Sequence, residues 1–286
     1  MVELRQRKSS PEKQQIQKMP SVNGRSRRAA DETTPATVDE LARRLRPLLS
    51  PIDARFSWHA MSPLAEEDQK QYLTDPVTAL PPTLRLLLPR IGIVLAPYLE
   101  RSAPKSPVSV VYKKPAEARL VLSTRVLSEK PSGKSAGREN DFAMLFFTIK
   151  DEQVADYHYF FYDELAALLS QTWPDSVQEI WHRLLREELS AEVHGEVDER
   201  SWHLKQALLR RPMAARKDGK PFRDYARESF RDTLTLFLHG ICCDIDVETG
   251  PRQIPSRYLR KRLEQLKKLF PPPEDHAVFP EDLTRR

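Results

Sequence analysis

The chain has 286 residues, of which 40% are hydrophobic and 30% are charged, and its formal net charge is +5. This composition is typical of a soluble globular protein with a sizeable core. The two cysteines are adjacent and poorly placed to bridge distant segments, which favours a reducing compartment. The polar N-terminus lacks a signal-peptide core, and prolines and an arginine interrupt the longest apolar run. The sequence therefore predicts a cytoplasmic protein without a membrane span.

Charge is segregated along the chain. Residues 1–35 carry eight Lys/Arg against four Asp/Glu and show no apolar periodicity, so we interpret them as a disordered basic tail. Residues 139–199 hold fifteen acidic and three basic residues, whereas 200–223 and 252–268 hold eight and seven basic residues with one acid each. Such segments either pair with each other inside one fold or present surfaces of opposite charge to different partners.

The first part of the body is predicted to be helical. Helices are expected over 38–49 and 63–73, and a regular helical stripe follows over 84–98. Pro89 lies inside this stripe and should kink or split the helix, because it lacks a backbone N–H and clashes with the preceding turn.

A region of strands is predicted next, since the hydrophobic period changes to two from residue 107. The expected strands are 108–112, 119–126, 142–149 and 157–162. Short links between them predict an antiparallel meander, and the nearly continuous apolar run of 142–149 predicts a strand covered on both faces.

Helices are expected again after the sheet. The patterns predict helices near 164–170, 177–189, 199–209, 222–245 and 257–269, and a Pro-rich tail over 271–286. We therefore predict an α+β fold: a mostly helical single domain over 36–270, with a four-stranded antiparallel sheet at about 107–162 packed by N- and C-terminal helices. Glu188 falls on the apolar face of its helix, where a carboxylate needs a partner or reaches solvent at the margin.

A polar stripe runs along the most apolar long helix, 222–245. Its members recur at steps of three or four residues: Glu228, Asp232, Thr235, His239, Cys242 and Asp246, with Cys243 beside them. The stripe is either a solvated face or a buried seam that faces the helix containing Glu188 and His194. His239 with Cys242 or Cys243 has the one-turn spacing of half a zinc site, but a second C-x-x-C or H-x3-H pair is missing from the sequence.

Candidate site residues follow from these patterns and from no complete motif, since G-x-G-x-x-G, Walker, H-E-x-x-H and G-x-S-x-G sequences are absent. The acid–base candidates are Glu188, Glu192, Glu196, Asp232 and His239. The candidate ligands of a zinc or other divalent metal ion are His194, His203, His239, Cys242 and Cys243. The candidate nucleic-acid or polyanion contacts are Arg210, Arg211, Arg216, Lys217, Lys220, Arg257, Arg260, Lys261, Lys267 and Lys268.

Three functions are compatible with this sequence. We expect a regulatory or protein-interaction protein without catalytic activity, whose partner is another protein and which needs no cofactor. The first alternative is a metal-dependent hydrolase with a site built from His194, Glu196, His239 and Cys242. The second is nucleic-acid binding through the basic tail and the C-terminal helix, although the nearly neutral body argues against a dedicated nucleic-acid domain.

Overall fold

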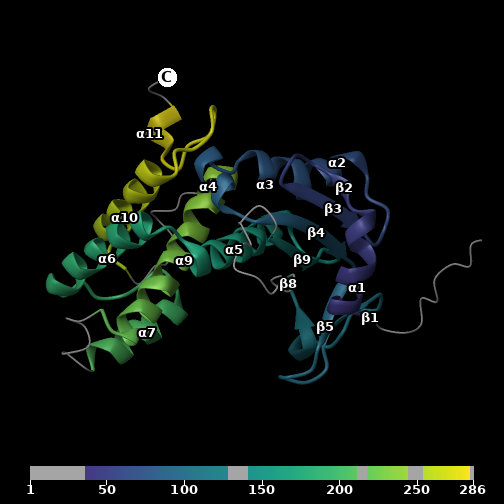
Figure 1. The fold of residues 1–286 in the computed structure, drawn as a ribbon, viewed down its shortest axis with the longest axis horizontal. Helices are drawn as coiled ribbons and strands as arrows, with labels where there is room; N and C mark the ends of the chain where they lie inside the picture. The colour runs from purple at the N-terminus through teal and green to yellow at the C-terminus, as the bar shows by residue number, and fades with distance from the viewer. Residues whose placement is uncertain (1–35, 128–140, 211–217, 244–253, 284–286) are drawn as a thin grey trace, which may run out of the picture. The chain divides into compact units, whose positions relative to one another are not determined.

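The computed structural model describes residues 36–127, 141–210, 218–243 and 254–283, so the predicted basic tail over 1–35 lies outside the described residues. The fold is α+β, as predicted from the sequence (Figure 1). It contains a five-stranded mixed sheet, a four-stranded antiparallel sheet and a set of helices that pack on one another beside the larger sheet.

The larger sheet has three parallel inner strands and two antiparallel outer strands. In spatial order these are β2 (Ser50–Pro51), β3 (Phe56–Ala60), β4 (Arg90–Ala96), β9 (Phe142–Thr148) and β8 (Ser123–Leu127). Almost all side chains of β4 and β9 are buried, as expected for strands covered on both faces. The predicted central position of 142–149 is thereby confirmed.

Alternate residues of these strands point into two different cores. Ile93 and Leu145 pack with the helices in the larger core, whereas Val94 and Phe146 pack in a smaller core with the antiparallel sheet. That sheet consists, in spatial order, of β1 (Ala36–Thr37), β6 (Val108–Val111), β5 (Tyr98–Arg101) and β7 (Leu120–Val121).

The remaining elements are helical. Before the sheets are complete, the chain forms α1 (Val38–Leu45), η1 (Arg46–Leu48), α2 (Glu66–Gln69), η2 (Lys70–Thr74), α3 (Asp75–Thr78), α4 (Pro82–Leu87) and η3 (Glu117–Arg119). After β9 it forms α5 (Val154–Thr172), α6 (Asp175–Ser190), α7 (Glu199–Leu209), α9 (Lys220–Cys243), α10 (Ser256–Leu269) and α11 (Pro280–Leu283). A side-chain capping box between Thr37 and Glu40 begins α1.

The helix predicted over 84–98 is wrong in its second half. Pro89 disfavours helical geometry in the residue before it, and Leu88 accordingly has the extended angles φ −78° and ψ 150°. Helix α4 therefore ends at Leu87, and the residues that follow form strand β4. An apolar run of this kind fits a helix and a strand buried on both faces equally well, so periodicity alone did not separate them.

The strand predicted over 157–162 is also wrong, because these residues lie in α5. Aromatic side chains favour strands in general, yet Tyr157, Phe161 and Tyr162 are buried here around a helix that is covered on several sides. The correction matters for function, because it turns His158 from a strand residue into a helix residue that faces α9.

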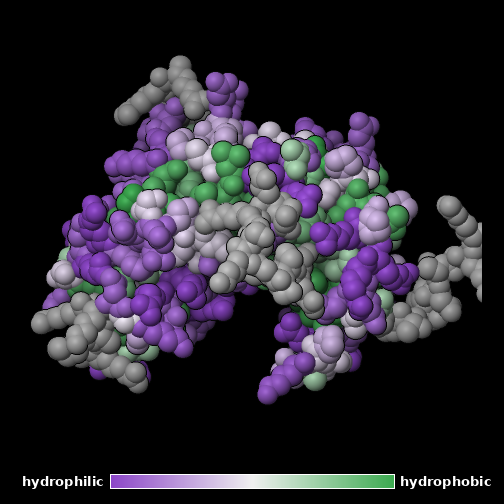
Figure 2. Space-filling model, viewed as in Figure 1, coloured by the Kyte–Doolittle hydropathy of each residue, from purple (hydrophilic) through white to green (hydrophobic). Residues whose placement is uncertain are grey.

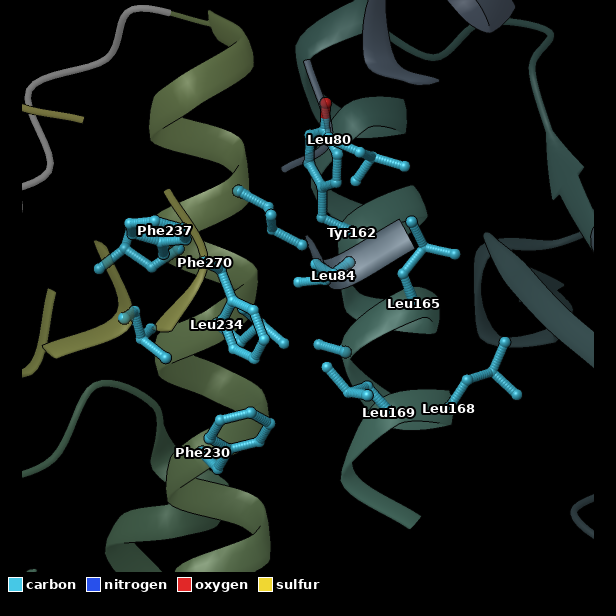
Figure 3. Packing of buried hydrophobic residues seen from close by; sticks show 14 of the residues in the cluster. Leu80, Leu84, Tyr162, Leu165, Leu168, Leu169, Phe230, Leu234, Phe237 and Phe270 are labelled. Atoms are coloured by element: carbon cyan, nitrogen blue, oxygen red, sulfur yellow. The ribbon is translucent and has the colours of Figure 1, made fainter. Parts of the chain in front are cut away.

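Helix α9 is the central element of the helical part. It lies along α5, and Figure 3 shows the two helices side by side, with buried hydrophobic side chains of both, such as Phe230 and Leu169, in one cluster. Helices α6, α7 and α10 pack on other sides of α9. Where these helices meet solvent, on the face drawn in Figure 2, hydrophilic side chains predominate.

The C-terminal segment returns to this helical core. Val278 and Phe279 are each 3% exposed and belong to the larger core cluster, although the sequence indicated a Pro-rich tail from residue 271. Arg260 of α10 lies 4.4 Å from the centre of the Phe279 ring, so the charged face of α10 helps to cover this segment.

Candidate metal centre

The polar stripe of α9 is divided between two neighbours. At its C-terminal end, Cys242 and Cys243 face His158 of α5. The sequence analysis had suggested instead that they face the helix of Glu188. Nearer the middle of α9, Asp232 lies by Ser201 of α7. Asp246, the last member of the stripe, lies outside the described residues. The seam is therefore real at its cysteine end, but it is formed with α5.

Three side chains converge at this end. The Sγ atom of Cys243 lies 3.1 Å from Nδ1 of His158, and Sγ of Cys242 lies 3.7 Å from the same nitrogen. The two sulfurs and the imidazole nitrogen all lie within 4.8 Å of one another. His158 is buried and both cysteines are partly buried and not disulfide-bonded.

The imidazole of His158 is oriented from its other side. Its Nε2 lies 2.8 Å from the main-chain oxygen of Gln71, so Nε2 carries the proton and donates it to that carbonyl. The lone pair of Nδ1 is then directed at the two sulfurs. Gln71 belongs to η2, a π-helical turn, and such turns occur frequently at functional sites.

The position in the fold also favours a ligand site. Helix α5 follows the carboxyl end of β9, and α2 and η2 follow that of β3. These strands are parallel members of one sheet, and ligands of α/β sheets bind outside the carboxyl ends of parallel strands. Tyr157 packs edge-on against Phe147 of β9, which fixes the start of α5 on the sheet.

The charges of the cluster are unevenly shared. A hydrogen bond from Cys243, with further hydrogen bonds from His158 and Tyr162, lowers the pKa of the Cys242 thiol to about 4 despite partial burial. The same hydrogen bond and the neighbouring thiolate raise the pKa of Cys243. Burial opposes protonation of His158, but its contacts with Cys242 raise its pKa overall. Of the two cysteines, Cys242 is therefore the one that more readily carries a thiolate.

The ligand set is suited to a thiophilic metal ion. Two cysteine sulfurs and one histidine nitrogen are ligands typical of Zn²⁺ and Cu⁺, and a histidine ligand characteristically donates its second N–H to a carbonyl or carboxylate. His239 lies one turn before the cysteines and packs edge-on against Tyr159, and its buried Nε2 has no hydrogen-bond partner among the described residues. Burial lowers the pKa of His239, and the neighbouring His158 lowers it further.

The glutamate candidates belong to a separate and fully buried network. Arg262 of α10 donates to Glu188 at 2.6 Å and to Glu196 at 2.6 Å, and all three side chains are at most 1% exposed. Glu196 also forms an ion pair with Lys205 at 3.2 Å and accepts a hydrogen bond from the Tyr225 hydroxyl at 2.5 Å. Burial alone would raise the pKa of Glu196, but the charge and hydrogen bonds of Arg262 bring it to about 2.

This arrangement rules out the predicted hydrolase site. Glu196 contacts Tyr225, and Tyr225 and Cys242 are seventeen residues apart on α9, which is about 25 Å along the helix axis. His194 is exposed on the loop between α6 and α7. The four residues proposed for that site, which also included His239, therefore do not come together.

The other candidates are dispersed. Glu192 is exposed with a positive φ of 52°, and exposed His203 pairs with Glu199 of its own helix at 3.3 Å. Asp232 is partly buried, and within the described part of the chain one of its carboxylate oxygens has no hydrogen-bond partner. None of these three belongs to the cluster of His158.

The basic candidates of α10 are largely neutralised by acidic side chains. Arg260 pairs with Glu281, Lys261 with Glu187 and Lys267 with Asp282. Arg257 stacks on the neighbouring Tyr258 ring, and Arg210, Lys220 and Lys268 are exposed. Arg211, Arg216 and Lys217 lie outside the described residues. In the described residues, the acidic and basic segments thus pair with each other inside the fold. This is one of the two outcomes that the charge pattern allowed.

Comparison with protein-family models, curated protein sequences and solved structures found no match to this chain. In the described part of the chain, no helix is both long enough and apolar enough to cross a membrane.

Proposed function

We propose that this chain is a metal-responsive regulatory protein that binds a thiophilic ion, Zn²⁺ in the first place, through His158, Cys242 and Cys243. The observation that carries the proposal is the orientation of His158: the Gln71 carbonyl accepts a hydrogen bond from Nε2–H, and Nδ1 faces both sulfurs. When bound, the ion supplies a fixed link between α5 and the end of α9.

Regulation fits the position of the cluster. Cys243 is the last described residue of α9, so an ion held by both cysteines would restrain this part of the helix against α5 and η2. A second protein that contacts the end of α9 would then distinguish the metal-bound state from the metal-free state. We propose such a protein as the partner, and a reducing compartment such as the cytoplasm as the location, because two partly exposed thiols must stay reduced to bind metal.

Cobalt substitution tests the site directly. Titration of the reduced, metal-free chain with Co²⁺ should give one bound ion per chain, with the sulfur-to-cobalt charge-transfer absorption that thiolate ligands produce. Cys242→Ser and His158→Gln should each weaken binding by at least about 100-fold, since even residues that only orient a ligand contribute 10–100-fold. His203→Gln is the matched control, because this histidine is exposed on α7, pairs with Glu199 and packs edge-on against Trp202, both on its own helix.

The proposal fails under either of two results. The first is the absence of a charge-transfer band at saturating Co²⁺. The second is one-to-one binding that Cys242→Ser and His158→Gln leave unchanged, which would place the ion elsewhere. Circular dichroism of each variant shows whether α5 and α9 remain folded, so that a loss of binding is assigned to the ligand and not to unfolding.

A further inference from the structure

The two cysteines of the cluster have a second chemical property in addition to metal binding. Their sulfurs lie within 4.8 Å of each other at the end of α9, and both side chains are partly exposed, so a small oxidant reaches them. Each is a free thiol, and each lies by Nδ1 of His158, which is oriented to accept a proton from either one.

We propose that Cys242 and Cys243 form a reversible oxidation switch, in which a hydroperoxide converts the pair into a disulfide and thereby releases the metal ion. This inference rests on the proposed metal site, whose regulation it describes. The partner reagent is a small hydroperoxide, with hydrogen peroxide as the simplest member of the class.

The reaction balances in two steps. One cysteine sulfur attacks an oxygen of hydrogen peroxide, the O–O bond breaks, and a sulfenic acid and hydroxide form; the hydroxide takes a proton and leaves as water. The second sulfur then attacks the sulfenic sulfur, an S–S bond forms, and the second oxygen leaves as water after taking a proton. In total, two thiolates, one peroxide and two protons give one disulfide and two water molecules.

Metal release follows from the loss of ligands. A disulfide has no thiolate to offer, so the cluster would retain only the imidazole of His158. A single neutral nitrogen does not hold Zn²⁺ in the way that a three-ligand site does.

Reversibility follows from the adjacency of the two residues. Consecutive Cα atoms lie about 3.8 Å apart, whereas disulfide-bonded cysteines ordinarily need Cα atoms about 4.4–6.8 Å apart. A bridge between neighbours is therefore strained, and strained bridges are easily reduced. The backbone change falls in the last described turn of α9.

The test uses the full-length chain, zinc-loaded and metal-free, treated with equimolar hydrogen peroxide. Free thiols should fall from two to none, the chain should stay monomeric on a non-reducing gel, and zinc should appear in solution as a complex with a chromophoric chelator. Tryptic cleavage after Arg231 and Arg252 gives a peptide that holds both cysteines, and its mass should be lower by two hydrogens. Dithiothreitol should restore both thiols and zinc binding.

Cys243→Ser separates the two steps. This variant keeps one reactive thiol and cannot form the bridge, so Cys242 should be trapped as a sulfenic acid by dimedone. Intermolecular disulfides, or sulfinic and sulfonic acids without an internal bridge, would overturn the switch. If cobalt binds but no internal bridge forms, the oxidation switch is wrong and the metal site is supported. If the bridge forms in a chain that binds no cobalt, the metal site is wrong, and so is the proposed release of metal.

Discussion

Asp232 is predicted to destabilise the folded chain at neutral pH. It lies on α9, and one of its carboxylate oxygens is buried with no partner in the residues that the structure describes. Burial, and after it the charges of Asp198 and Glu228, raise its pKa from 3.8 to about 7, although a hydrogen bond to Ser201 opposes this. Asp232→Asn removes the charge and keeps the shape of the side chain.

The size and the sign of the effect follow from linkage. The pKa of Asp232 is higher in the folded chain than in the unfolded chain. The protonated carboxyl therefore contributes its full stability to the folded state below about pH 3.8, and this contribution is lost as the pH rises to about 7, where the folded carboxyl ionises. A shift of about three units corresponds to roughly 4 kcal/mol at about 1.36 kcal/mol per unit. Because the side chain is partly exposed, we expect about half of this, ~2 kcal/mol, to be gained by Asp232→Asn above pH 7.

Urea denaturation of wild type and variant at pH 5 and pH 8 measures this gain. The difference in unfolding free energy should be about 2 kcal/mol at pH 8 and below about 1 kcal/mol at pH 5, where the folded carboxyl of the wild type is still protonated. Asp224→Asn, on the same helix, is the matched control variant and is measured at the same two pH values. An equal difference at both pH values would refute the reasoning, because it would mean that Asp232 titrates normally in the folded chain.

Three further predictions concern stability. Arg262→Met should lower the free energy of unfolding, measured by urea denaturation, by about 3–5 kcal/mol, because it leaves buried carboxylates without their main cation. Its control, Arg260→Met on the surface of α10, should lower it by less than about 1 kcal/mol. Similar losses in the two variants would contradict the buried network. Phe146→Asp should lower the thermal midpoint strongly, since Phe146 is 0% exposed in the smaller core, and an unchanged midpoint would show that β9 is misplaced. Thr37→Ala should cost about 1 kcal/mol through loss of the α1 capping box, and no change in the denaturation midpoint would show that this cap is not formed in solution.

The later helices were predictable because each has one clear apolar face and local end signals. Helix α9 follows the expected pattern from Pro221 onward, and Asp198 caps α7 as predicted, with its side chain accepting from the Arg200 amide. The failures occurred where the chain is apolar on all sides. Strand β4 and the beginning of α5 are both continuous hydrophobic runs, for which the period carries no information.

The candidate site was half predictable. Cys242 and Cys243 were recognised as possible ligands from their spacing to His239, but His158 was missed because its segment was assigned to a strand. The available signal was the histidine inside the aromatic run 157–162, at a position where the other residues favour burial. The role of Gln71 could not be read from the sequence at all, since it acts through its main-chain oxygen and η2 has no distinct residue pattern.

The role of Glu188 was open at the sequence level. A carboxylate on the apolar face of α6 needs a partner or an exposed margin, and the structure supplies Arg262 from a helix that is 74 residues later in the chain. Such a partner is not visible from local spacing. It became apparent only when α6 and α10 were found packed against each other.

The 74 residues between Glu188 and Arg262 have a consequence for the synthesis of the chain. At a synthesis rate of about 5–20 residues per second, the glutamate of α6 leaves the ribosome roughly 4–15 seconds before the guanidinium that neutralises it. During this interval Lys205 is the cation of the described network that is available to Glu188 and Glu196, so closing the interior would bury carboxylate charge that is not fully compensated. A chain that stops before α10 lacks Arg262, and we expect it to be less stable for this reason.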